Sequence, residues 1–140
     1  MSDIGEAIIT QLKTETTVTD LAGSRFRPDE LSQGETLPAV AYFVFAEDSE
    51  SALTGKVGLA QSRVQLDCHA TTRAAANGLA GAIVDKLDGL TGTYSGITIY
   101  DCFKDNRYYR VDAPEPGASI SRRRVVLDFV VNHSEPVPTL

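Results

Sequence analysis

Residues 62–70 have the sequence Ser-Arg-Val-Gln-Leu-Asp-Cys-His-Ala, in which polar and apolar side chains alternate from Arg63 onward. Neighbouring side chains of a strand point to opposite faces, so this pattern predicts a strand with one face in the core. The inward set is Val64, Leu66, Cys68 and Ala70, and the outward set is Arg63, Gln65, Asp67 and His69. The next segment predicts the main helix, capped by Thr71 or Thr72 and running to about Asp88, with Gly89 behind it.

This main helix has two contrasting sides. Its apolar side chains recur at spacings of three and four residues and predict the side that packs on the sheet: Ala76, Leu79, Ile83 and Leu87. The opposite side carries Ala74, Gly78 and Gly81. Each mid-helix glycine costs about 1 kcal/mol relative to alanine. These small residues indicate either a tolerated solvent face or close approach of another segment or subunit.

Upstream, the chain predicts a first helix and a second strand. Ile4, Ile8 and Leu12 repeat every four residues after the capping residues Ser2 or Asp3, and 18–23 predicts a short helical turn stopped by glycine. Residues 25–28 predict an edge strand that Pro28 limits. Residues 39–46 are apolar on both alternations and predict a strand covered on both faces, and 47–55 predicts an acidic loop.

Downstream, two further strands complete the predicted sheet. The third strand has Ile97, Ile99 and Phe103 on one face and Tyr100 and Cys102 on the other, and 107–111 continues it or starts another. Residues 113–117 predict a loop. The last strand, about 119–132, directs four apolar side chains inward: Val125, Leu127, Phe129 and Val131.

The order helix, hairpin, helix, hairpin predicts an α+β fold. We expect an antiparallel sheet of about four long strands with two helices packed on one face. Residues 1–133 are expected to form a single domain, and 134–140 a flexible tail. The face without helices is expected to carry an apolar set that would suit a partner: Tyr42, Val44, Tyr100, Val126 and Val130.

Composition limits the classes of function. The chain has 140 residues, 15.1 kDa and a net charge of −6, and its pI near 4.8 argues against a general binder of nucleic acid or of anionic membranes. No apolar run approaches the roughly 18–20 residues of a membrane span, and residues 1–6 lack the pattern of a signal peptide. These features favour a soluble protein made inside the cell.

Charge is unevenly distributed along the chain. Residues 1–56 hold 10 acidic and 4 basic residues, whereas 57–140 hold 9 of each. These clusters are either solvated faces or patches through which copies of the chain associate. The candidate interface residues are, on the acidic side, Glu47, Asp48 and Glu50, and on the basic side, Arg107, Arg110, Arg122, Arg123 and Arg124.

The sequence contains no motif of an enzyme or a cofactor site. Cys68 and His69 are neighbours on a strand and point to opposite faces, so they cannot act as a nucleophile–base pair. Cys102 and His133 add no close ligand spacing for a metal. Phosphate-binding, hydrolase and metalloprotease motifs are missing. We therefore expect no catalytic residues, no metal and no cofactor.

The order of several short motifs resembles the tail completion, or tail terminator, proteins of long-tailed bacteriophages and gene transfer agents. The resemblance covers roughly residues 4–133, and its motifs stand at Val18…Leu21-Ala22-Gly23-Ser24-Arg25-Phe26-Arg27-Pro28, Leu37-Pro38-Ala39-Val40-Ala41-Tyr42, Gly58-Leu59-Ala60…Arg63-Val64-Gln65-Leu66-Asp67-Cys68 and Arg123…Leu127-Asp128-Phe129…His133. It departs from the family at Ala39, where an aromatic residue is common, and at the acidic segment 29–31.

This resemblance implies a structural virion protein without catalysis. Such proteins form a ring, usually a hexamer, that caps the tail tube, stops its polymerisation and joins the head or neck. The implied partners are other copies of the chain, the tail tube protein and the head or neck completion protein. The implied location is the head-proximal end of the tail in the virion, after assembly in the cytoplasm of a bacterial host.

Two other functions are compatible with the residues alone. A head–tail connector of the neck would share the habit of forming rings. A small cytosolic ligand-binding or regulatory module would need a pocket of several hundred Å3 with converging polar groups.

Overall fold

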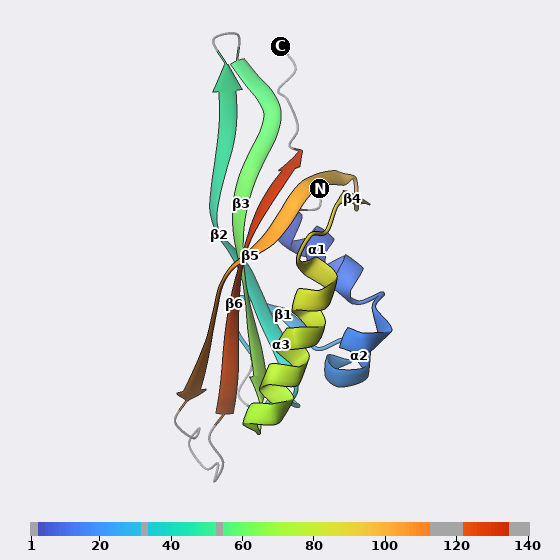
Figure 1. The fold of residues 1–140 in the computed structure, drawn as a ribbon, viewed down its shortest axis with the longest axis vertical. Coiled ribbons are helices and arrows are strands. Elements are labelled where there is room, and N and C mark those ends of the chain that lie inside the picture. The colour runs from blue at the N-terminus through green and yellow to red at the C-terminus, as the bar shows by residue number, and fades with distance from the viewer. Residues whose placement is uncertain (1–2, 32–33, 53–54, 113–121, 135–140) are drawn as a thin grey trace.

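The computed structural model describes residues 3–31, 34–52, 55–112 and 122–134, and of 50–52 and 55–57 it describes the backbone course alone. The described helices are α1 (Ile4–Leu12), α2 (Thr16–Ala22) and α3 (Arg73–Leu87). The described strands are β1 (Phe26–Pro28), β2 (Ala39–Ala52), β3 (Gly55–Ala70), β4 (Gly92–Tyr94), β5 (Ile97–Asp112) and β6 (Arg122–Ser134). They form one sheet in the order β1-β2-β3-β6-β5-β4. Figure 1 shows the helices on one side of this long, twisted sheet.

The predicted α+β class is confirmed, and its details need three corrections. The four long strands β2, β3, β6 and β5 pair antiparallel, as expected. β1 joins β2 in parallel, so the sheet is mixed rather than antiparallel, and β4 adds a sixth strand within a predicted loop. The predicted short turn at 18–23 is a third helix, α2, which ends at Gly23 with a φ of +58°.

The helices begin where the capping residues predict. Asp3 Oδ1 accepts a hydrogen bond from the Glu6 amide at 2.7 Å. Thr72 Oγ1 accepts one from the Ala75 amide at 3.1 Å. These bonds satisfy amide groups that the first turn of a helix leaves without a partner.

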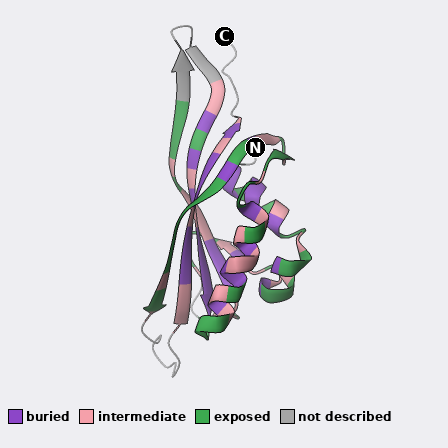
Figure 2. Ribbon diagram, viewed as in Figure 1, coloured by how far each residue is buried: buried purple, intermediate pink, exposed green. Residues whose placement is uncertain are grey.

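One core lies between the helices and the sheet. The predicted stripe of α3 and the predicted inward sets of β3 and β6 are all fully buried there. Figure 2 shows this buried layer where the helices meet the strands. A Cβ added at Gly78 or Gly81 would meet nothing within 4 Å, so no other part of the described chain approaches that side of α3.

The acidic loop predicted at 47–55 is wrong for 47–52 and for Gly55, which belong to strands, and 53–54 lie outside the described residues. β2 extends to Ala52 and β3 begins at Gly55, and the hairpin projects beyond the helices (Figure 1). A two-stranded ribbon away from the core needs no alternation of apolar residues.

Three other predicted segments lie outside the described residues: the loop at 113–117, the strand residues 119–121 and the tail residues 135–140. Ser134, predicted as the first residue of the tail, is the last residue of β6.

Two strands place their side chains differently from the prediction: β5, which contains bulges, and β2, which is apolar on both faces. The register shift in β5 after Ile99 places Cys102 in the core with Ile99 and leaves Phe103 39% exposed, so Cys102 and Phe103 lie on the faces opposite to those predicted. Tyr42 and Val44 pack on the helix side of the sheet, not on the uncovered face. β2 is apolar in both sets, so alternation could not indicate which set turns inward.

Candidate assembly interface

The sheet face without helices, called here the open face, carries aromatic side chains on both halves. On β2, the rings of Phe43 and Phe45 meet edge to face with centroids 6.2 Å apart, and Phe45 is 46% exposed. On β5, Phe103 lies opposite Val130 of β6, and Tyr108 lies opposite Val126. Aromatic and β-branched residues opposite each other on a sheet stabilise the strand pair. The aromatic rings also give this face apolar side chains that remain partly in water, whereas Val126 and Val130 are buried.

A polar network crosses the open face between the aromatic residues. Arg124 Nη1 contacts Asp67 Oδ2 at 3.2 Å, and its Nη2 contacts Asp112 Oδ1 at 3.4 Å. Asp67 also accepts a hydrogen bond from Gln65 at 2.9 Å. The network therefore joins β3, β6 and β5, and it holds the open face in one shape without a helix above it.

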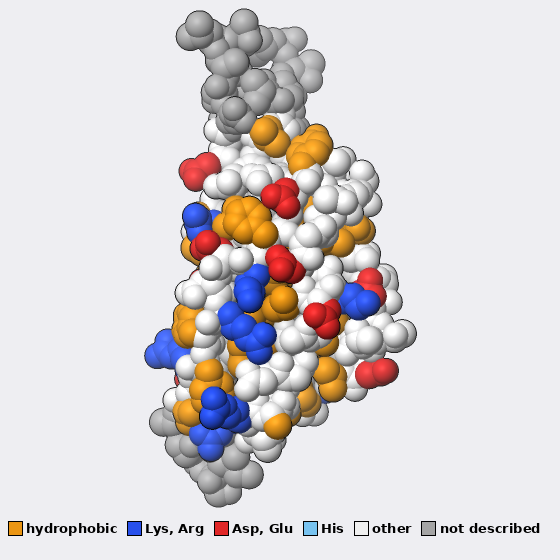
Figure 3. Space-filling view, in the orientation of Figure 1, with side chains coloured by type: hydrophobic (Ala, Val, Ile, Leu, Met, Phe, Trp, Pro, Cys, Tyr) orange, Lys and Arg blue, Asp and Glu red, His pale blue; other side chains and the backbone are white. Residues whose placement is uncertain are grey.

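The predicted basic residues are distributed over both sheet faces at the lower end of β5 and β6. Arg110 is exposed on the open face, and Arg107 lies on the helix side, where its Nη2 donates to Asn77 Oδ1 of α3 at 3.2 Å. Arg122 and Arg123 are partly buried near the start of β6. Arg124 already pairs with two carboxylates. Figure 3 shows basic side chains gathered over the lower half of the sheet.

The predicted acidic residues lie toward the other end of the sheet. Glu47 and Asp48 are exposed on β2, opposite Ser62 and Gln61 of β3, and Glu50 lies where the structure describes no side chain. Ser62 and His69 are seven residues apart on β3, and His69 lies opposite Arg124. At about 3.3 Å per residue, the acidic and basic ends are roughly 23 Å apart along the strand. The two sets of charge therefore do not meet within one chain.

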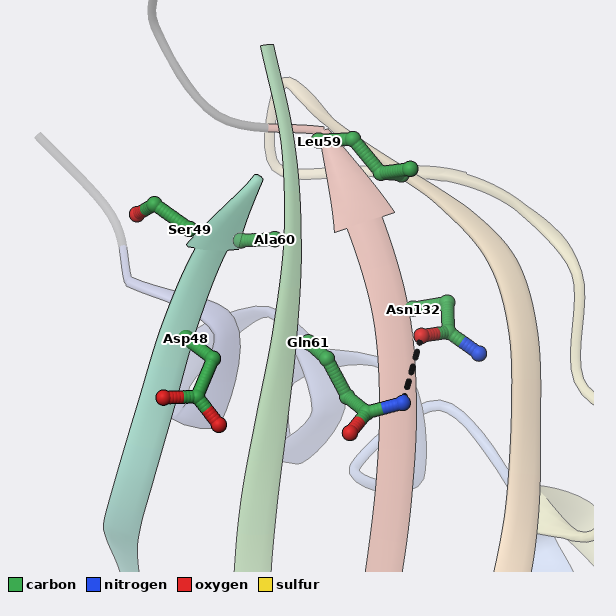
Figure 4. Close-up of a pocket in the computed structure, with 6 residues that line it drawn as sticks. All are labelled: Asp48, Ser49, Leu59, Ala60, Gln61 and Asn132. Atoms are coloured by element: carbon green, nitrogen blue, oxygen red, sulfur yellow. Dashed lines mark hydrogen bonds between the residues drawn. The ribbon is translucent and has the colours of Figure 1, made fainter. Parts of the chain in front are cut away.

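A shallow pocket of about 250 Å3 opens at the base of the hairpin (Figure 4). Its lining comes from β2, β3 and β6, where Gln61 Nε2 donates to Asn132 Oδ1 at 3.1 Å. Pockets for small ligands are usually about 300–1,000 Å3 and enclose most of the ligand. This depression is smaller and carries one exposed carboxylate, from Asp48. It gives little support to a ligand-binding module.

A buried Ser–His pair went undetected in the sequence. Ser62 Oγ lies 2.7 Å from His133 Nε2, and His133 Nδ1 lies 2.7 Å from the Ser134 carbonyl. That carbonyl can only accept, so Nδ1 carries a proton, and Ser62 Oγ also donates to Glu47 Oε2 at 3.5 Å. Ser62 is 0% and His133 4% exposed, which leaves a substrate no access. The pair satisfies polar groups where β3 and β6 meet.

The described residues hold no cluster of three or more His, Cys, Asp or Glu side chains that could bind a metal ion. Cys68 and Cys102 are both buried, and burial raises the pKa of the Cys102 thiol to about 12 and that of Cys68 further still. Thiols with such pKa values are protonated and unreactive at neutral pH. No described helix has the length and apolar character that a membrane crossing requires.

His69 gives the open face a defined response to pH. Its ring is 7% exposed, its Nδ1 has no hydrogen-bond partner among the described residues, and burial, with Arg122 and Arg124 nearby, lowers its pKa to about 4. In the unfolded chain the pKa is near 6.5. Above pH 6.5 His69 is neutral in both states and does not reduce the free energy of unfolding. As the pH falls from 6.5 toward 4, the unfolded chain takes up a proton at His69 that the folded chain does not, so the free energy of unfolding decreases.

We expect His69→Gln to lose less stability than the wild type between pH 6.5 and 4, because glutamine takes up no proton on unfolding. Urea denaturation at a series of pH values measures this difference. Equal losses in both proteins across that window would contradict the assignment.

Comparison with known proteins identifies the chain. The family model described as Tail completion protein gp17 matches residues 6–131, which is most of its length. The chain belongs to this family. Its resemblance to tail completion proteins is thereby confirmed, and it is a structural protein of phage-type tails, for which the family implies a non-enzymatic role.

A solved structure shares the fold. The chain is similar to a chain from a structure titled "Virion of native gene transfer agent (GTA) particle", with a TM-score of 0.61, 20% identity and coverage of 92% of both chains. At that level of identity the likeness concerns the fold. No curated protein shows significant similarity to the sequence.

Sequence reasoning missed part of this surface. The family motifs identify the protein, but they do not show that Phe43, Phe103 and Tyr108 share the open face. The signal for Phe43 was present, since Ala41, Phe43 and Phe45 alternate with the other apolar set of β2. For β5, bulges at two positions break the alternation, and nothing in the sequence marks them.

Proposed function

We propose that this tail completion protein is a tail terminator. Copies of the chain form a ring, of six subunits by analogy with the family, on the last ring of the tail tube. The ring stops polymerisation of the tube, and its other side joins the head or neck completion protein. It would work at the head-proximal end of the tail in the virion, after assembly in the bacterial cytoplasm.

The observation that carries this proposal is the open face, where Phe45, Phe103 and Tyr108 stay 46%, 39% and 40% exposed. A helix layer covers the other face, so the fold itself leaves this surface for a partner. Exposed apolar side chains gathered on one face mark sites of protein association. Within a tail protein, the available partners are other tail components.

The separation of the charged ends supports a ring rather than a two-fold dimer. A ring closes through heterologous contacts, in which two different patches of each copy meet. The acidic end near Glu47 and the basic end near Arg110 are two such patches, and they are too far apart to neutralise each other within one chain. The projecting hairpin at 47–56 is a second contact that would reach an adjacent ring of the tail.

Deletion of the gene tests the proposal through tail length. Without a terminator the tube keeps polymerising, so we expect overlong tails in electron micrographs, and normal tails when the gene is supplied in trans. Tails of normal length that remain unattached to heads would contradict termination and indicate a head–tail connector. Normal infectious particles would contradict both functions.

A further inference from the structure

The sheet has two long strands whose outer edges are partly unoccupied. β1 lies beside β2 at Val40–Tyr42, and β4 lies beside β5 at Ile97–Ile99. Within the described residues, no strand flanks β2 on that side from Val44 to Asp48, or β5 from Arg107 to Val111. These two stretches are called the β2 edge and the β5 edge. Unpaired edges are templates for pairing with another chain.

The rest of the β5 side is already covered. The Gly89 amide donates to the Cys102 carbonyl at 2.7 Å, and the Lys104 amide donates to Asp88 Oδ1 at 3.0 Å. The turn after α3 therefore occupies the middle of β5. A partner strand can reach β5 below Lys104, along the β5 edge.

Backbone groups on both edges point outward. The Val40 amide and the Tyr42 carbonyl bond to the segment of β1, so the backbone N–H and C=O groups of these two residues point away from β3. The bulge at Phe45 shifts this alternation by one residue, so the backbone groups of Glu47 also point away from β3. On β5, Cys102 and Lys104 face outward, and the bulge at Asp105 then turns Tyr109 outward. Glu47 and Tyr109 can therefore exchange hydrogen bonds between two copies, as residues of an antiparallel pair do.

The two edges carry opposite charge on both faces of the sheet. Glu47 and Arg107 lie on the helix side, because their partners Ser62 and Leu127 belong to the buried set. Asp48 and Arg110 lie on the open face. Charged side chains on edge strands commonly prevent unwanted pairing. Here they oppose contact between like edges and favour contact between unlike edges.

We propose that the β2 edge of one copy pairs antiparallel with the β5 edge of the next, so that the sheet continues from subunit to subunit. β2 and β5 run in opposite directions within the sheet. A copy related by rotation about an axis inclined to the strands by less than a right angle therefore presents its β2 antiparallel to β5. This inference rests on the proposed function in one respect, namely that copies of the chain associate as a ring.

One register satisfies the charges on both faces. With Glu47 opposite Tyr109, Asp48 lies diagonal to Arg110 and Glu47 lies diagonal to Arg107. Diagonal neighbours are about 7–8 Å apart at their Cα atoms, which long side chains span. Within one chain, Tyr109 pairs with Val125, Val125 with Cys68, and Cys68 with Val40, so Tyr109 and Val40 lie on one line across the sheet. Glu47 pairs with Ser62 and Val40 with Cys68, so successive copies are displaced by six residues of β3, roughly 20 Å along the strand. A closed ring then has its strands inclined to the ring axis, as in a barrel.

Disulfide cross-linking tests this register directly. In it Ala46 lies opposite Arg110, in a pair without mutual hydrogen bonds, whose Cα atoms are about 4.5 Å apart and suit a disulfide. We expect the double variant Ala46→Cys, Arg110→Cys to give a ladder of covalent oligomers under mild oxidation, read on non-reducing gels. Each single variant should give about tenfold less cross-linked dimer, since neither position meets its own copy.

The matched control moves one cysteine to the other face. In the pair Ala46→Cys, Val111→Cys, the second residue is an exposed neighbour that points to the helix side, so we expect no ladder. The native cysteines are buried and should not contribute. Cross-linking is done on the purified protein and on assembled tails from a complemented deletion. A ladder that is equal in the control, or missing in both preparations, would overturn the edge pairing.

A charge exchange keeps the proposal testable without cysteines. We expect Asp48→Arg or Arg110→Asp alone to weaken self-association about tenfold or more, and the two together to restore it in light scattering. No restoration, with each variant folded by circular dichroism, would count against the pairing. These outcomes are independent of tail length: overlong tails on gene deletion with no ladder would retain the terminator and reject the edge contact.

Discussion

Phe129→Ala is expected to lower the free energy of unfolding by about 3–5 kcal/mol. Phe129 is the largest fully buried side chain of the protein's described residues, and it lies on β6 opposite Val64 of β3. Its loss would leave a cavity between the two central strands and the helix layer, where the surroundings are strands paired on both sides and cannot collapse. Domains of this kind are stable by about 5–15 kcal/mol, so much of the native stability would disappear.

Urea denaturation followed by circular dichroism measures this loss. Phe103→Ala is the matched control, because this phenylalanine is 39% exposed on the open face and its removal creates no closed cavity. We expect the control to cost about 1 kcal/mol or less. Equal costs for the two variants would contradict the assignment of the core to the helix side of the sheet.

Arg124→Met is expected to cost about 2–3 kcal/mol, between the value of an exposed ion pair and that of a fully buried one. The Arg124 and Asp67 side chains are 20% and 10% exposed, and removing the guanidinium leaves the Asp67 carboxylate without its cation. Asp112 would lose the same partner. The open face would then lose the network that holds three strands together.

A second substitution separates the charge from the packing. Asp67→Leu added to Arg124→Met should recover part of the loss, because it removes the unpaired carboxylate. Arg110→Met, at an exposed position on the same face, is the matched control and should change stability by less than about 0.5 kcal/mol. If Arg124→Met were as mild as this control in thermal or urea unfolding, the network would contribute nothing measurable.

Because Arg124 is part of this network, the three consecutive arginines at 122–124 are a poor choice for testing assembly. Replacing Arg122, Arg123 and Arg124 together by glutamate would disturb folding through Arg124, and a failure to assemble would then have two explanations. Arg110 is exposed and takes no part in the Arg124 network, so we expect its variants to change assembly without disturbing folding. The charge exchange with Asp48 uses that difference.

Elements with one buried face were predictable because their periodicity has a single physical cause. The alternation of β3 and the stripe of α3 both follow from burial on one side, and both are confirmed. The same reasoning failed for β2, whose two apolar sets made Tyr42 and Val44 look suited to either face. It also failed for 47–52, where a ribbon beyond the core has no apolar pattern to recognise.

The amino-acid sequence by itself determined the α+β class, the core of the central strands and main helix, and membership of a tail completion family. Local propensity and one-sided burial act along the chain, so they leave a readable period. Only the tertiary structure decided where the bulges fall, which residues share the open face and which edges remain unpaired. Those features depend on pairing between strands far apart in sequence, where a shift of one residue moves every later side chain to the opposite face.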